Sequence, residues 1–303
     1  MKKLIQISLI AIIAAGLTFV SCKKSTTTPT ESTADQQQMA ADEHTHSVEI
    51  QNSLNEANDA MGTTAFGKTG TIYGATVIID SSLKKITINY NGNNKDNSRL
   101  RTGQIVVQLT SGTKWKDAGA NVSITYTAFK ITNNSNLKSI TFDGVVNVTN
   151  QSGGRVFIDP NVVHIATSTD FKATFDDATQ RTWNLSRKRT FTNVAGELSV
   201  KEEGNGSAGG NSNLISWGQN RKGDNFYTQI STPIIYNTMF SSTCPNNFMQ
   251  GEKVHILPGS KLTVNFGLDA SGTAVSGSNC PTSYLVKWVN GSGQTKSLLI
   301  TYK

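Results

Sequence analysis

The stretch Lys85-Ile86-Thr87-Ile88-Asn89-Tyr90 decides the fold class, because its apolar and polar residues alternate strictly. In an extended chain this alternation puts Ile86, Ile88 and Tyr90 on one face and the polar residues on the other. One buried face and one wet face are typical of an antiparallel sheet. The stretch therefore predicts a β-strand whose apolar residues point inward.

The same design returns near the C-terminus as Lys261-Leu262-Thr263-Val264-Asn265-Phe266. Each copy leads into a polar loop, an apolar run and a hairpin-like turn, and each ends in Ile-Thr-Tyr. The two units, Lys85–Tyr126 and Lys261–Tyr302, are both 42 residues long. This pattern indicates a duplicated three-strand unit that serves as scaffold.

Most of the chain after residue 64 consists of short β-branched and aromatic runs separated by Asn, Gly, Ser and Asp turns. The prediction is an all-β fold, either an antiparallel meander or sandwich or an open-barrel-like sheet system, with a short N-terminal helix. The Gly- and Asn-rich stretch Glu202–Asn213 has two interpretations. It is a linker between lobes 64–201 and 214–303, or a long loop within one continuous domain 64–303.

Residues 1–21 form a predicted signal peptide, with Lys2 and Lys3 ahead of an apolar run that is short for a membrane span. Ser21 stands directly before Cys22, which resembles a bacterial lipobox, although Phe19 occupies a position where Leu or Val is more usual. The resemblance implies cleavage before Cys22 and lipid on its thiol. A retained anchor helix and plain secretion are the alternatives.

Residues 22–45 are rich in Ser, Thr, Gln and Ala, which predicts a disordered tether behind the lipidated Cys22. Residues 46–63 hold the expected amphipathic helix, whose core is Val48–Met61, with Ile50, Leu54, Ala57 and Met61 on one face. Lys23 after the cysteine, in place of Asp, favours the outer membrane. Lys23-Lys24-Ser25-Thr26 is not the acidic run typical of surface export, which favours a domain that faces the periplasm over one exposed at the cell surface.

The formal charge of +7 is concentrated around Arg181, Arg187, Lys188 and Arg189, with Trp183 and Phe191 interleaved. This pattern fits a patch for an anionic ligand, or simply a strand with basic outward positions. For an envelope protein we expect no nucleic acid as a partner.

Cys244 and Cys280 remain once Cys22 is assigned to lipid. An even pair in an oxidising compartment usually forms a disulfide, so this bond is predicted between them. Two free thiols that serve catalysis or a metal are the alternative.

The sequence contains no nucleophile elbow, zinc-protease motif or phosphate loop. His44 and His46 lack a third ligand, whereas His164 and His255 lie inside strands; we therefore expect no metal and no cofactor. The remaining leads are carboxylates and tryptophans. The carboxylates are Asp143, Asp159, Asp170, Asp176 and Asp177, and the tryptophans are Trp115, Trp183, Trp217 and Trp288. Turn formation and core packing account for both sets equally well.

Three stretches resemble a family of uncharacterised Bacteroidota lipoproteins: Lys85–Tyr90 with Arg99–Val107 after it, Val146–Asn150, and Lys261–Phe266 with Cys280 following. The resemblance brings no activity. The sequence as a whole predicts a non-catalytic binding or structural module at the outer membrane, with a glycan, lipid or protein as ligand. The alternative is a glycan-directed envelope hydrolase that uses carboxylates in a cleft.

Overall fold

The computed structural model describes residues 72–194, 197–238, 244, 247–277, 279–289 and 293–302. Between residues 38 and 57 it describes only residues 38, 42, 45, 49, 50, 52–54, 56 and 57. The predicted signal peptide, Cys22, His44 and His46 lie outside these residues.

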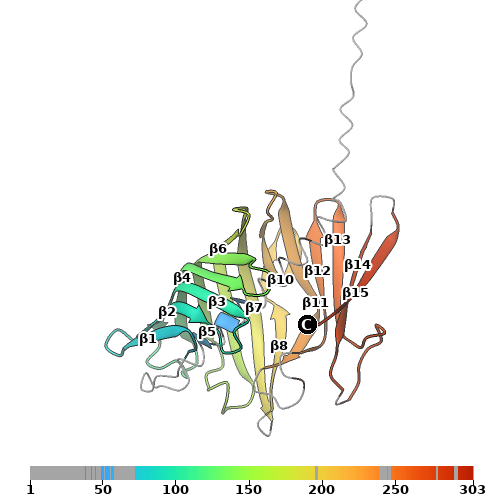
Figure 1. The fold of residues 1–303 in the computed structure, drawn as a ribbon. Helices are drawn as coiled ribbons and strands as arrows, with labels where there is room; N and C mark the ends of the chain where they lie inside the picture. The colour runs from blue at the N-terminus through green and yellow to red at the C-terminus, as the bar shows by residue number, and fades with distance from the viewer. Residues whose placement is uncertain are drawn as a thin grey trace, which may run out of the picture.

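In the described part of the chain, fifteen antiparallel strands form one continuous sheet, which confirms the all-β prediction (Figure 1). The strands are β1 (Ala75–Asp80), β2 (Lys85–Asn93), β3 (Arg99–Ser111), β4 (Ala120–Asn133), β5 (Ser139–Asn150), β6 (Val162–Phe175), β7 (Gln180–Val194), β8 (Glu197–Gly204), β9 (Gly206–Ala208), β10 (Asn211–Gln219), β11 (Asn225–Asn237), β12 (Phe248–Leu257), β13 (Ser260–Leu268), β14 (Ser283–Val289) and β15 (Thr295–Thr301). Nearly every strand pairs with its neighbours in the sequence, so the sheet is a meander.

The middle of the sheet is where this simple order changes. β7 pairs with β10 along its first half and with β8 along its second half, and β11 pairs with the same two strands. β8 and β10 therefore share the space between β7 and β11. Glu202–Asn213, predicted as a linker or a long loop, instead contributes to β8, β9 and β10. The two predicted lobes are thus joined through continuous hydrogen-bonded strands.

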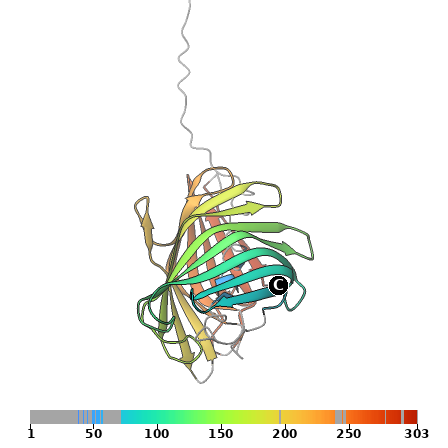
Figure 2. The ribbon, with the colours of Figure 1, turned by 90° about the vertical axis from the view of Figure 1, so that its left-hand side faces the viewer.

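The sheet is strongly curled, and the N-terminal helical residues lie inside the curl (Figures 1 and 2). Ile50, Leu54 and Ala57 are buried among side chains of β2 to β7, as the helical periodicity predicts. A second hydrophobic cluster fills the inner face of the C-terminal half, from β7 to β14. The curl thus encloses two apolar cores within one sheet.

A row of β-bulges crosses β3, β4, β5 and β6 and accounts for the curl. Gly103, Ala128, Gly144 and Asp170, one from each strand, have positive φ at the row. β6 continues through the irregular residue at Asp170 as one strand. Arg155–Asp159 is a turn in which the Asp159 carboxylate accepts a hydrogen bond from the Arg155 backbone.

The predicted duplication matches the strand order but not the register. β2 to β4 and β13 to β15 are both three-strand meanders, and Ile86, Ile88 and Tyr90 are buried as expected. However, Ile88 pairs with Ile105, whereas its counterpart Val264 pairs with Val286, so the loop spanned is five residues longer in the second unit. The copies share a strand pattern, and their loops set different pairings.

Helical residues begin earlier than predicted. Gln38, Asp42 and Thr45 are helical, although the tether was expected to continue to residue 45. The reason is charge pairing with the sheet: both carboxylate oxygens of Asp42 bind the Arg221 guanidinium, at 2.6 and 2.7 Å. Gln38 also donates to Asp42 one helical turn away. These contacts hold the start of the helix against the β domain. The composition of the segment does not predict them.

Candidate functional site

The predicted disulfide is present between Cys244 and Cys280, with a Cα–Cα distance of 5.3 Å. Cys280 lies in the loop between β13 and β14, and Cys244 precedes β12. The Asn247 side chain donates to the Pro281 carbonyl at 2.9 Å beside the bond. The disulfide therefore fastens the β13–β14 loop to the segment that enters β12.

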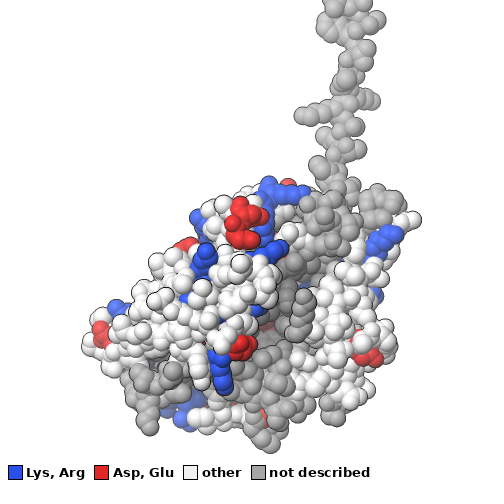
Figure 3. Space-filling model, viewed as in Figure 1, with Lys and Arg blue, Asp and Glu red and all other residues white. Residues whose placement is uncertain are grey.

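The four predicted basic residues all lie on β7 but do not form a surface patch. Arg181, Arg187 and Arg189 are only 2 to 3% exposed, and Lys188 is half-buried on the opposite face of the strand. The interpretation that basic positions point outward is therefore wrong for the three arginines. The surface agrees with this, because the face drawn in Figure 3 carries charged side chains dispersed among uncharged ones.

Strand alternation explains the burial of these arginines. Arg187 and Arg189 share odd-numbered positions with Trp183, Leu185 and Phe191, so they share the face that the apolar residues bury. Arg181 follows the same parity but lies apart, with its guanidinium carbon 4.1 Å from the centre of the Phe226 ring. The signal was present in the sequence, because arginines that alternate in phase with buried aromatics must also point inward.

Arg187 and Arg189 meet two residues from neighbouring strands inside the sheet. Arg187 Nη1 lies 3.4 Å from Glu202 Oε2, and Glu202 stands directly across from Arg189 in the β7–β8 pairing. Tyr236 on β11 completes the group: burial is the main cause of its raised pKa, and Glu202, Arg189 and Arg187 lie close enough to act on it as well. We call Arg187, Arg189, Glu202 and Tyr236 the buried basic cluster.

The buried basic cluster contains more cationic donors than acceptors. Two guanidinium groups face one carboxylate, and all three are at most 4% exposed. Within the described part of the chain, Arg187 Nε, Arg189 Nε and Arg189 Nη1 have no hydrogen-bond partner. Burying such groups without partners costs free energy, so an arrangement of this kind calls for an additional acceptor.

Neither His164 nor Tyr236 supplies the missing acceptor charge. His164 lies directly across from Arg189 in the β6–β7 pairing. Burial, with the Arg189 charge as a smaller cause, lowers the pKa of His164 to about 3, so its imidazole is neutral. Burial likewise raises the pKa of Tyr236, and Glu202 adds to that rise, so the phenol keeps its proton. The cluster as a whole keeps a positive charge.

Apart from the buried basic cluster, the structure has a charged groove at the start of the helix, with a volume of about 290 Å³. Its floor includes Ile131, Ile140 and Phe175. Around them stand Asp42, Glu49, Arg99, Lys138, Asp176, Asp177 and Arg221. Most of these charges already form pairs with one another, such as Arg221 with Asp42 and with Asp177. The groove is therefore largely neutralised from within.

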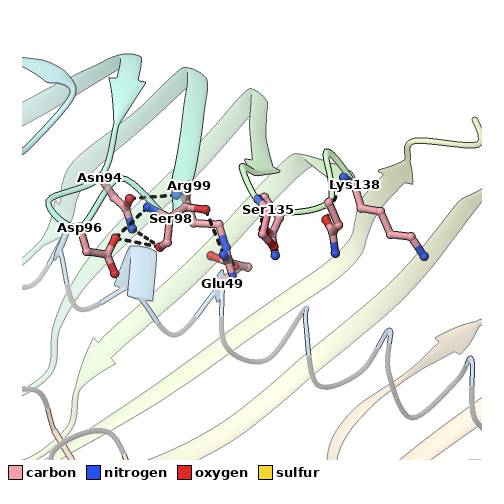
Figure 4. A network of polar contacts seen from close by, with 9 residues as sticks. Glu49, Asn94, Asp96, Ser98, Arg99, Ser135 and Lys138 are labelled. Atoms are coloured by element: carbon pink, nitrogen blue, oxygen red, sulfur yellow. Dashed lines mark hydrogen bonds and ion pairs between the residues drawn. The ribbon is translucent and has the colours of Figure 1, made fainter. Parts of the chain in front are cut away.

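The Glu49–Arg99 pair shows how the groove wall is built (Figure 4). Arg99 Nε donates to Glu49 Oε1 at 3.0 Å. The β2–β3 turn holds Arg99 in place, because Asn94 Oδ1 accepts from the Arg99 backbone and Asp96 accepts from Ser98. Burial raises the pKa of Glu49, and the Arg99 contact opposes that rise. This turn chemistry serves to dock the helix.

The carboxylates considered for hydrolysis have local structural partners. Asp143 accepts from the Ala128 backbone at the bulge row, and Asp159 accepts from the Arg155 backbone. Asp177 accepts from the Thr179 backbone, which with the Thr179 hydroxyl lowers its pKa, and it also pairs with Arg221. Asp170 has positive φ at the bulge row. Turn and bulge formation accounts for all four, and Asp176 lines the charged groove.

The histidines and tryptophans within the described residues are also built into the sheet. His255 is 2% exposed, and its Nδ1 lies 3.1 Å from the Thr228 hydroxyl. Trp115, Trp183 and Trp288 are buried in the two cores, and Trp217 is half-buried on β10. No group of three metal-binding side chains occurs among the described residues.

Sequence reasoning missed an aromatic row on the inner face of the C-terminal half. One ring comes from each successive strand or its end: Tyr236, Phe248, Phe266, Tyr284 and Tyr302. Adjacent ring centres along the row are 4.9 to 6.0 Å apart. The row begins at the buried basic cluster, since Tyr236 belongs to both.

No family model, curated protein or solved structure matches this chain. The resemblance to uncharacterised Bacteroidota lipoproteins therefore stays a prediction. Within the described residues, no helix has the length and apolar character needed to cross a membrane.

Proposed function

We propose that this chain is a non-catalytic binding module of the bacterial cell envelope. A lipid on Cys22 holds it at the outer membrane, with the β domain facing the periplasm. The observation that carries the binding role is the buried basic cluster. Two buried arginines with unpartnered donors on the inner face of the sheet are unfavourable for packing. The same donors are suited to bind a ligand that supplies acceptors.

Several features support a binding role over catalysis. Four of the five carboxylates that could serve hydrolysis are occupied in turns, bulges or ion pairs. The cluster itself offers donors and charge, and its Tyr236 phenol and the neighbouring His164 are held in their neutral forms. Such groups bind an electron-rich ligand, and they include no activated nucleophile.

The anchoring part of the proposal is tested by incorporation of labelled palmitate in a Bacteroidota host. We expect label on the wild type and none on the Cys22→Ala variant. A variant in which Cys244 and Cys280 are both serine serves as the matched control and should keep its label. An unlabelled wild type would contradict lipid anchoring.

The binding part is tested by native mass spectrometry of the protein released gently from membranes. A binding module should carry a non-covalent ligand that appears as a reproducible added mass. The same measurement is made after the protein has been incubated with an extract of the growth medium. If the wild type shows only its own lipidated mass in both samples, the binding role is contradicted.

A further inference from the structure

We propose that the ligand is recognised through an oxyanion, a phosphate or carboxylate group, that lies between Arg187 and Arg189 inside the curled sheet. This inference rests on the binding role proposed above and names the chemistry of that site. The proposed site differs from the surface patch that the sequence suggests. Its arginines are buried, and only Arg187 and Arg189 lie together, whereas Arg181 lies apart.

The spacing of the two arginines suits a single oxyanion. Residues two apart on a strand project from the same face about 7 Å apart. An oxyanion can bridge such a gap. Each hydrogen bond spans about 2.9 Å, and two oxygens of the same anion can each accept from one of the arginines. Guanidinium groups present flat forks of N–H donors that match phosphate and carboxylate. Arg187 Nε, Arg189 Nε and Arg189 Nη1 are the donors left for it.

The charge of the surroundings favours an anion over a neutral ligand. Glu202 compensates one guanidinium, through its 3.4 Å contact with Arg187, and leaves the charge of Arg189 uncompensated. His164 across from Arg189 is neutral, and so is the Tyr236 phenol. In a medium of low dielectric constant, an unpaired cation is costly and attracts an anion strongly.

Arg189 is therefore the residue whose purpose a purely structural account does not explain. The Arg189 guanidinium carbon lies 5.4 Å from the Phe191 ring centre, a contact that a neutral side chain would make equally well. The Arg189 side chain also reaches the Tyr236 hydroxyl, but its Nε and Nη1 have no partner and no carboxylate of the described residues forms an ion pair with it. Replacing a buried cation that lacks a carboxylate partner by an apolar side chain is often neutral or stabilising. An arginine at this position lowers stability, and a binding site gives a reason for that cost.

The test measures the melting temperature of the lipid-free domain after refolding in inorganic phosphate, in acetate, or in chloride at matched ionic strength. Refolding lets the anion reach a buried position. Phosphate or acetate at about 100 times its dissociation constant should raise Tm by roughly 5 to 10 °C over chloride. Whichever oxyanion gives the shift at lower concentration identifies the class.

Three variants make the result specific. Arg189→Met should lose the shift while its Tm in chloride stays equal to or above that of the wild type. Lys188→Met, next in sequence but on the opposite face, should keep the full shift. Arg189→Lys retains the charge but lacks the forked N–H donors of the guanidinium, so it should keep part of the Tm shift. This conservative variant also provides a comparison if Arg189→Met fails to fold.

The outcomes separate this inference from the proposed function. An equal shift in the wild type and Arg189→Met overturns the oxyanion site, and so does the absence of any shift. If native mass spectrometry still detects a membrane-derived ligand in those cases, the binding role stands and only its chemistry is wrong. If no ligand is detected either, both proposals fail.

Discussion

His164 is a buried residue whose ring lies between two aromatic side chains. Its ring centre is 5.0 Å from that of Trp115 and 4.9 Å from that of Phe191. Burial, with Arg189 as a smaller cause, lowers the pKa of His164 to about 3 from its ordinary 6.5. At the scale of single residues, this histidine is part of the packing that surrounds the buried basic cluster.

The lowered pKa of His164 predicts how stability depends on pH. The unfolded chain takes up a proton near pH 6.5, whereas the folded chain stays neutral down to about pH 3. Acid therefore favours the unfolded state, and the free energy of unfolding falls as pH drops through this window. Between pH 7 and pH 5 the contribution is about 2 kcal/mol.

The check is urea unfolding of the wild type and of His164→Phe, which preserves the ring contacts. The variant should lose about 2 kcal/mol less than the wild type between the two pH values. Equal losses in both proteins would show that His164 is protonated in the folded state.

Glu202 is the carboxylate that compensates the buried basic cluster. Replacing it with glutamine leaves Arg187 as a second uncompensated buried cation. We expect Glu202→Gln to reduce the free energy of unfolding by roughly 3 to 5 kcal/mol. Glu203→Gln is the control, since Glu203 pairs with Lys201 at a partly exposed position, and it should cost less than about 1 kcal/mol. Similar costs for both variants in urea would contradict the burial of the pair.

At the scale of elements, the N-terminal helix is fixed by three carboxylates spaced seven residues apart. Asp42 pairs with Arg221, Glu49 with Arg99, and Glu56 with Arg101. A spacing of seven residues is close to two helical turns, so the three acids form one stripe beside the apolar one. The apolar periodicity predicts the face that Ile50, Leu54 and Ala57 bury, but the partners of the acidic stripe are distant in sequence and could not be predicted.

The bulge row gives a prediction about the curl of the sheet. A Cβ at Gly103 would meet the Ala128 carbonyl, whereas a Cβ at Gly119 would meet nothing within 4 Å, and both glycines have positive φ. Gly119→Ala should therefore cost roughly 1 to 2 kcal/mol from backbone strain alone. Gly103→Ala should cost clearly more, because the clash adds to the same strain. Equal destabilisation in thermal or urea unfolding would argue against close contact at the bulge row.

The curl itself was beyond sequence reasoning for a physical reason. Gly103 and Gly144 mark two of the four bulges, but Ala128 and Asp170 adopt positive φ without being glycine. Alternation predicts strands well, as at Ile86, Ile88 and Tyr90. It does not predict an irregular residue that is stabilised by the neighbouring strand.

At the scale of the whole molecule, one continuous sheet predicts one folding unit. β8 is hydrogen-bonded to β7 on one side and to β11 on the other, and β10 does the same. Separate fragments 64–201 and 214–303 would each expose unpaired strand edges and part of a core. We expect neither fragment to unfold cooperatively by circular dichroism, whereas the intact domain should. A cooperative transition in either fragment would support independent lobes.

The topology of the whole sheet explains why the candidate site was only partly predictable from the sequence. Arg187 and Arg189 stood out by charge, and their parity with Trp183, Leu185 and Phe191 places them inside. Glu202 and Tyr236 come from β8 and β11, and only the branched middle of the sheet brings them to β7. Charge could be located from the sequence, but its partners required the topology.

The most direct test of the central claim is a crystal structure of the phosphate-refolded domain at a resolution that shows ordered water. We predict density for one oxyanion within hydrogen-bond distance of Arg187 Nε and of Arg189 Nε or Nη1. The same crystals of Arg189→Met should lack it. Water molecules alone at these donors, or an Arg189 side chain that turns to pair with Glu202, would contradict the proposal that this interior binds an anion.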